Sequence, residues 1–126
     1  MLKGNYSELA EFHGIFLEDS FVLSINENPG QVEFIMEFVL TRDHPNYRPP
    51  KSGEQYCYTP GVLIFQSQQV RWLRGSTGSF RDSSGEIDLG NIDSLTLTGP
   101  DVFFVEGDWG QIEIVSDLPP VVKLSQ

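Results

Sequence analysis

An alternating hydrophobic pattern runs from Phe21 to Leu40, on either side of the turn-forming tripeptide Asn28-Pro29-Gly30. Successive side chains of a strand point to opposite faces of a sheet, so a period of two is typical of a half-buried strand. The pattern therefore predicts a β-hairpin. Its two arms place the following apolar residues on one face each: Phe21, Leu23 and Ile25 on the first, and Val32, Phe34, Met36, Phe38 and Leu40 on the second.

The second arm also carries apolar residues on its other face. Ile35 and Val39 lie there together with Glu33 and Glu37. A strand with apolar residues on both faces is typical of the middle of a sheet, where both sides are covered. We therefore expect the second arm to be a central strand rather than an edge strand.

Short apolar runs separated by turn residues continue along the rest of the chain. We expect a turn at Thr59-Pro60-Gly61, an irregular crossover from Gly75 to Gly90, and a last edge strand over 121–124. Extended structure is expected to resume at 56–58, and further strands are expected at 62–65, 69–73, 92–97, 102–105 and 111–115. Seven or eight strands at this spacing predict one all-β domain over residues 1–126, an antiparallel β-sandwich or a partly open barrel.

One short helix is expected before the hairpin, from Tyr6 to His13. Leu9, Phe12 and then Phe16 have the spacing of one helix face, and Asn5 stands in the capping position. The segment is short, so the helix would be a minor part of an otherwise all-β chain.

The net charge of −10 is distributed unevenly along the 126 residues. The net charge is −6 over residues 1–41, +4 over residues 42–81, and −8 over residues 82–126. The overall sign disfavours nucleic acid as a partner, because phosphate binding depends on a basic face. An acidic surface either keeps a small protein soluble or recognises a basic protein partner.

The sequence carries no signal for a membrane or an oxidising compartment. Its single cysteine, Cys57, cannot form an intramolecular disulfide, and no apolar run approaches the length of about 20 residues that a membrane span requires. The first residues contain no apolar stretch of the kind found in signal peptides. We therefore expect a cytoplasmic protein with no membrane partner.

Residue patterns for catalysis or metal binding are weak. Cys57 has only His13 and His44 as potential bases, and no Gly-x-Ser-x-Gly or phosphate-binding glycine motif occurs. The acidic stretch 82–88 alternates like a calcium loop, but Gly85 does not match the order of an EF-hand. The sequence therefore predicts neither an enzyme nor a metal site nor a cofactor.

The best candidate for function is the middle of the chain. The segment 42–55 contains three prolines and almost no aliphatic residues, and long loops of this kind are often functional. Aromatic residues and arginine are enriched at the centres of protein interfaces. The candidate binding residues are His44, Tyr47, Arg48, Tyr56, Tyr58, Trp72 and Arg74. A structural reading competes with this one: Trp72 and one of the tyrosines would then be core residues. For Trp109 the sequence allows either a core residue or an exposed contact residue.

These residues favour a non-catalytic protein-interaction module, of which an antidote to a basic toxin or enzyme is one specific form. The alternative is a β-barrel that binds a small molecule in an apolar cavity. Its lining would be Phe34, Phe38, Phe65, Phe103 and Phe104. A third possibility is self-association through the edge strand at 121–124.

Overall fold

The computed structural model describes residues 4–5, 12–53, 56–74 and 90–125. Their strands are arranged in two antiparallel sheets with the orders β1-β6-β7-β8-β5 and β2-β3-β4-β9. The strands are β1 (Gly4–Asn5), β2 (Ile15–Asn28), β3 (Gln31–Leu40), β4 (Cys57–Gln66), β5 (Gln69–Arg74), β6 (Ile92–Gly99), β7 (Val102–Gly107), β8 (Gly110–Val115) and β9 (Val121–Leu124).

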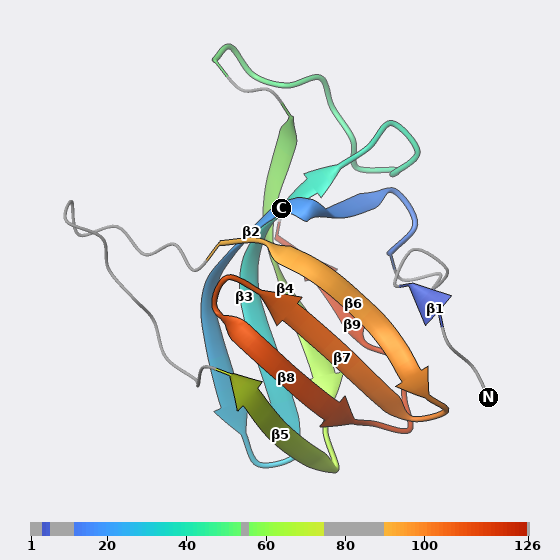
Figure 1. The fold of residues 1–126 in the computed structure, drawn as a ribbon. Coiled ribbons are helices and arrows are strands. Elements are labelled where there is room, and N and C mark those ends of the chain that lie inside the picture. Colours follow the sequence, from blue (N-terminus) through green and yellow to red (C-terminus); the bar gives the residue numbers. More distant parts are fainter. Residues whose placement is uncertain (1–3, 6–11, 54–55, 75–89, 126) are drawn as a thin grey trace, which may run out of the picture.

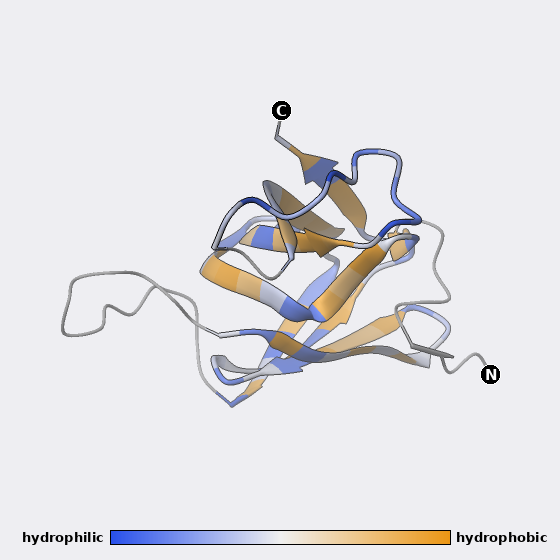
Figure 2. Cartoon of the chain, turned by 90° about the horizontal axis from the view of Figure 1, so that it is seen from above, coloured by the Kyte–Doolittle hydropathy of each residue, from blue (hydrophilic) through white to orange (hydrophobic). Residues whose placement is uncertain are grey.

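The two sheets pack face to face as a sandwich, with β6, β7, β8 and β5 in front of β2, β3, β4 and β9 in Figure 1. The same two layers are seen from above in Figure 2, where hydrophilic residues dominate the connection from β3 to β4. The predicted all-β class and antiparallel sandwich are therefore confirmed. The described residues contain no helix long and apolar enough to cross a membrane.

The predicted hairpin is confirmed as β2 and β3, and its second arm has the expected phase. The turn residue Gly30 has φ of +75°, a conformation that favours glycine. Pairing with β2 on one side and β4 on the other makes β3 a central strand, as expected. The five inward residues predicted on it are fully or almost fully buried: Val32, Phe34, Met36, Phe38 and Leu40.

The predicted inward face of the first arm is wrong in part. Ile25 is buried as expected, but Val22 is buried where Phe21 and Leu23 were expected, and these two are only half-buried. The cause is irregular pairing, because the register of β2 shifts against β3 between Phe16 and Phe21 and again between Val22 and Ser24. Each extra residue in a strand moves the following side chains to the opposite face.

The predicted turn at Thr59-Pro60-Gly61 is also wrong, because β4 continues through all three residues. The Pro60 carbonyl accepts a hydrogen bond of 2.8 Å from the Ser125 backbone, just beyond the end of β9. The N–H that proline lacks would point to the same side, where pairing with β9 ends, so no bond to β3 is lost. A side chain at Gly61 would meet the Lys123 carbonyl oxygen at 2.5 Å.

The expected helix over 6–13 and the crossover over 75–90 fall mostly outside the described residues, as does the acidic stretch 82–88. Phe16 was expected on the helix face, and it lies in β2 instead. Its position is set by strand pairing with Val39 of β3, and not by helical spacing. The expected edge strand at 121–124 is confirmed as β9, which pairs with β4 alone.

The core lies between the sheets and is rich in aromatic side chains. Phe65 contacts Phe34 and Phe103 edge to face, with ring centroids 5.9 and 5.6 Å apart. Trp109 is buried against Phe34 and donates a hydrogen bond of 3.0 Å to the Asn91 carbonyl, so it is a core residue. Cys57 is buried as well, as expected for a small hydrophobic side chain.

Candidate functional site

The seven predicted binding residues fall into two separate groups. The first group lies in the connection after β3 and at the start of β4, and consists of His44, Tyr47, Arg48, Tyr56 and Tyr58. Trp72 and Arg74 lie on β5, an edge strand of the other sheet.

Strand pairing gives the separation of the two groups. Trp72 donates a hydrogen bond of 3.2 Å to Glu27, whose position pairs through β3 with Phe65. Phe65 lies seven residues after Tyr58 on β4. At a rise of about 3.3 Å per residue, this places Glu27, the partner of Trp72, roughly 23 Å along the strands from Tyr58.

The two side chains of the second group contact other residues of the protein. The Trp72 ring is half-buried and contacts Trp109 edge to face at 6.1 Å. Arg74 donates a hydrogen bond of 2.9 Å to the Gly107 carbonyl, although its side chain is exposed. Both side chains therefore have partners within the fold.

The first group is built on a wide bulge at the start of the β2–β3 pair. Phe16 pairs with Val39 and Phe21 with Glu37, so residues 17–20 of β2 face the single residue Phe38. The fully buried Ser20 hydroxyl bridges the bulge, accepting a hydrogen bond from the Val39 N–H and donating one to the Phe16 carbonyl, both at 2.8 Å. The bulge thus has a satisfied polar centre.

The connection 41–53 is held by close backbone contacts to Gly14, just before β2. The Thr41 N–H donates a hydrogen bond of 2.8 Å to the Gly14 carbonyl, and two turns follow through His44 to Tyr47. The Asn46 N–H donates a hydrogen bond of 3.0 Å to His44 Nδ1. Gly14 has φ of +79°, and a side chain there would meet the backbone of His44 at 2.7 Å. The loop is therefore held in one position against β2.

We call the resulting cluster of side chains the aromatic end. The Phe21 and Tyr58 rings stack with centroids 5.7 Å apart, and Tyr56 contacts Tyr58 edge to face at 6.1 Å. An open pocket of about 260 Å³ adjoins them. The members of the aromatic end are Phe16, Phe21, Val39, Tyr47, Tyr56 and Tyr58.

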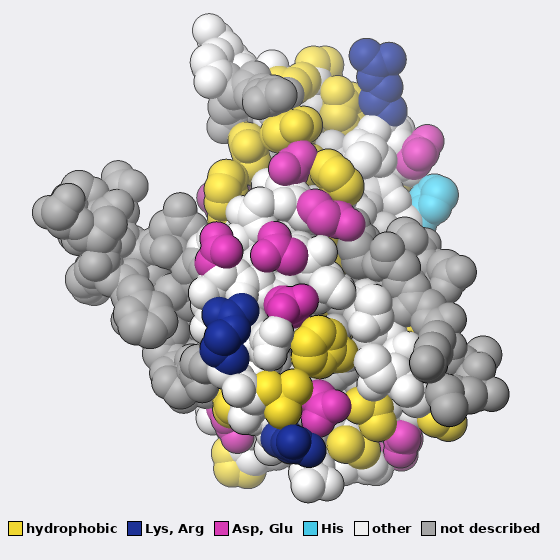
Figure 3. Space-filling view, in the orientation of Figure 1, with side chains coloured by type: hydrophobic (Ala, Val, Ile, Leu, Met, Phe, Trp, Pro, Cys, Tyr) yellow, Lys and Arg dark blue, Asp and Glu magenta, His cyan; other side chains and the backbone are white. Residues whose placement is uncertain are grey.

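The side chains of the aromatic end differ in how far they are exposed to solvent. Phe16 is 40% exposed, whereas Val39 is buried beneath its neighbours on the outer face of β3. Tyr47 is half-buried and packs against the core, which fixes the middle of the loop. In the space-filling view of Figure 3, hydrophobic side chains gather at the upper end of the molecule, with carboxylates close below them.

Two titratable groups of this end have shifted pKa values. A hydrogen bond to Asp19, together with the negative charge of that carboxylate, raises the pKa of the Tyr56 phenol above its usual 10.0. Burial lowers the pKa of His44 below its usual 6.5, and the nearby His13 lowers it further. The neutral His44 imidazole keeps its Nδ1 available as the acceptor for the Asn46 N–H.

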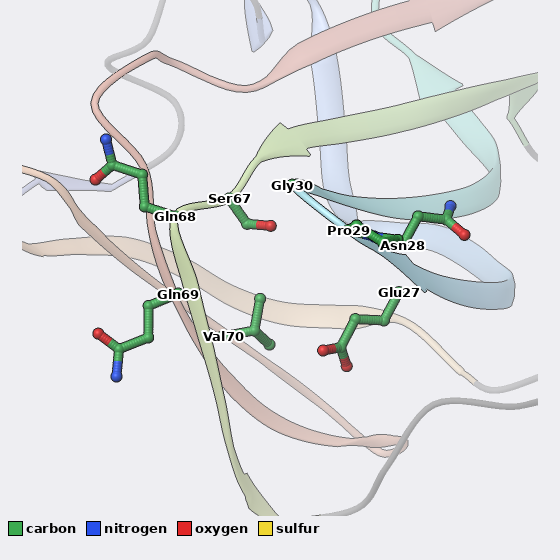
Figure 4. Close-up of a pocket in the computed structure, with 8 residues that line it drawn as sticks. All are labelled: Glu27, Asn28, Pro29, Gly30, Ser67, Gln68, Gln69 and Val70. Carbon is green, nitrogen blue, oxygen red and sulfur yellow. The ribbon is translucent and has the colours of Figure 1, made fainter.

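A second hollow, of about 400 Å³, lies at the opposite end between the β2–β3 and β4–β5 turns. Figure 4 shows Glu27 and Val70 turned toward one another across it, while Asn28 and Gln68 point away. Glu27 is already hydrogen-bonded to Trp72. This open hollow offers no aromatic side chain to a ligand, so we regard the aromatic end as the stronger candidate site.

The sequence analysis did not identify several residues of the site. Phe16, Phe21, Asp19 and Ser20 lie in or beside the bulge, and alternation alone does not reveal a bulge. The interruption Glu18-Asp19-Ser20 between two apolar residues was the only available signal.

Comparisons with known proteins found no matching family model, no similar curated protein and no similar solved structure. Within the described ranges, no three His, Cys, Asp or Glu side chains cluster in a way that would hold a metal ion.

Proposed function

We propose that this protein is a non-catalytic interaction module whose aromatic end binds a basic protein partner. The observation that carries the proposal is the partly exposed cluster of aromatic side chains, with Phe16 40% exposed, next to a loop that is hydrogen-bonded to Gly14 just before β2. Interface hot spots are enriched in tyrosine and other large aromatic residues, which bury a large area at a small entropic cost.

Preorganisation supports the same proposal. The loop is fixed by the hydrogen bonds from Thr41 to Gly14 and from Tyr47 to His44, and by packing of Tyr47 on the core. A surface that is already ordered loses less conformational entropy on binding than a mobile one. The aromatic end can therefore present its side chains without first folding around a partner.

Charge gives the expected chemistry of the partner. Asp19 and Glu37 lie on the β2 and β3 side of the aromatic end, and the whole chain has a net charge of −10. Arg42 and Arg48 lie on the loop side, so the surface has a negative and a positive flank. A basic partner with an apolar anchor would approach faster because of the net charge, and the two flanks would set its orientation.

The small-molecule alternative receives less support. Three of the phenylalanines that would line a cavity, Phe34, Phe65 and Phe103, are buried in contact with one another. Phe104 is half-buried on the other face of β7 and pairs with Glu113 of β8. A cytoplasmic location remains part of our proposal, since the single cysteine is unpaired and buried.

Affinity capture from the native host's lysate tests the proposal, with bound proteins identified by mass at low and moderate salt. We expect a stoichiometric basic protein that is retained less as salt rises, because exposed charge pairs are screened. Tyr47→Ala should reduce its retention at both salt concentrations. Retention of the same protein by Tyr47→Ala at the wild-type level, with the fold intact, would remove the aromatic end from the proposal.

A further inference from the structure

We infer that another pocket, beside the connection 41–53, binds a carboxylate group. This open pocket of about 260 Å³ is lined by Asn46, Arg48, Thr59, Pro60 and Ser125. It lies where β4 extends beyond the end of β9.

Arg48 supplies the positive charge of this pocket. Its guanidinium donates only long hydrogen bonds, to the Cys57 sulfur at 3.7 Å and to the Tyr58 carbonyl at 3.4 Å. Among the described residues, the one ion pair joins Arg71 to Glu113, so Arg48 has no carboxylate partner there. The planar guanidinium therefore retains N–H donors for a carboxylate, which it can bind through two parallel hydrogen bonds.

Thr59 provides a second, independent indication. Its side chain is 7% exposed, and its Oγ1 has no hydrogen-bond partner among the described residues. A buried hydroxyl without a partner is costly, and such groups are rare in folded proteins. Thr59 lines the pocket, and a change of χ1 rotamer moves its hydroxyl to another staggered position. An oxyanion bound to Arg48 would give this hydroxyl an acceptor.

The remaining lining residues and the charge of the chain select the class of anion. Asn46 carries an amide and Ser125 a hydroxyl, so both can donate hydrogen bonds without adding charge. One arginine balances one negative charge, and the surrounding net charge of −10 disfavours a dianion such as phosphate. A monoanionic carboxylate, from a free organic acid or from a peptide C-terminus, matches these donors.

Titrations of the ¹⁵N-labelled protein, followed by amide chemical shifts, test this assignment. The probes are acetate, N-acetylglycine, the amide of N-acetylglycine, and inorganic phosphate. We expect both carboxylates to shift the amides of residues 46, 48, 59 and 125, and the uncharged amide to leave them unchanged. Equal affinities for the two acids would indicate a free organic acid, and tighter binding of N-acetylglycine would indicate a peptide C-terminus.

Three variants separate binding from folding. Arg48→Gln should weaken acetate binding about tenfold or more, because hydrogen bonds between charged groups are the strong ones. Thr59→Val, which keeps the shape of the side chain, should weaken it about threefold. Arg71→Gln removes the same charge from a distant exposed site and should change the affinity less than twofold.

Three results would overturn the assignment. These are an unchanged acetate affinity in Arg48→Gln, an equal response to the uncharged amide, and tighter binding of phosphate than of acetate.

Discussion

At the scale of single residues, Tyr56, just before β4, is paired with Asp19 in the bulge of β2. The phenol donates to the carboxylate and its pKa is raised, because ionisation would place two negative charges side by side. The contribution of this hydrogen bond to stability is therefore complete below pH 10. It is lost as the pH rises through the raised pKa of Tyr56.

Asp19→Asn should lower the pKa of Tyr56 toward 10.0, since it removes the negative charge that opposes ionisation. The measurement is a titration of the tyrosine ring Cζ resonances by NMR between pH 8 and 12. A Tyr56 pKa that is the same in the wild type and in Asp19→Asn would contradict the hydrogen bond.

Thr59 gives a second prediction at this scale. Thr59→Val removes a buried hydroxyl without a partner and keeps the volume of the side chain. We expect it to raise the free energy of unfolding by about 1 kcal/mol in urea denaturation. Thr98→Val, at an exposed position of β6, is the matched control and should change it by less than about 0.5 kcal/mol. A destabilised Thr59→Val protein would mean that the hydroxyl has a partner in the folded state.

At the scale of elements, the site depends on how the loop 41–53 docks on the start of β2. Gly14 allows this close approach, because any side chain there would collide with the backbone of His44. The hydrogen bond from Thr41 to Gly14 crosses the same contact. Displacing the loop would move Tyr47 off the core and open the aromatic end.

Gly14→Ala should therefore lower the free energy of unfolding by more than Gly53→Ala. Both glycines have positive φ, at +79° and +86°, but a side chain at Gly53 would meet nothing within 4 Å. Alanine at either position carries the same backbone penalty of about 1 kcal/mol. The additional collision at Gly14 should cost a further 1–3 kcal/mol, roughly.

Urea denaturation of the two variants measures this difference. Equal losses of stability would show that the loop does not pack on Gly14 as the structure has it.

The same elements show how far the sequence predicts the structure. β3 was predicted fully, because its strict alternation matches a central strand with one continuous core face. β4 was interrupted in the prediction, because Pro60 and Gly61 are turn residues by local chemistry. A strand can contain Pro60 here because pairing with β9 ends next to it. Glycine is required at position 61 because the Phe38 ring lies 3.0 Å from the position of a side chain there. Neither fact is local in sequence.

Only the part of the candidate site that is local in sequence was predicted. Tyr47, Tyr56 and Tyr58 are near one another in the sequence, and the fold brings them together. Trp72 was grouped with them by the same proximity, but β5 belongs to the other sheet. Phe16 and Asp19 join the site only through the bulge, which three-dimensional pairing creates.

At the scale of the whole molecule, the two ends of the sandwich differ in chemistry. One end has the aromatic cluster and the pocket with Arg48, and the other has the open hollow near Glu27. The edge strand β9 has only four residues and carries Lys123, features that discourage pairing between edges of separate copies. The surface most suited to a partner is therefore the aromatic end rather than the β9 edge.

Two exposed hydrophobic residues allow the central claim to be tested with a matched pair of variants. Phe16 lies at the aromatic end and is 40% exposed, and Leu73 lies on β5 and is 41% exposed. Serine at either position removes a similar exposed apolar surface. The measurement is the amount of basic partner that each variant retains from the native host's lysate at low salt.

We expect Phe16→Ser to retain less than about a tenth of the partner bound by the wild type, as for an interface hot spot. Leu73→Ser should retain the wild-type amount. Equal retention by the two variants, or loss in Leu73→Ser alone, would contradict the assignment of the binding surface to the aromatic end.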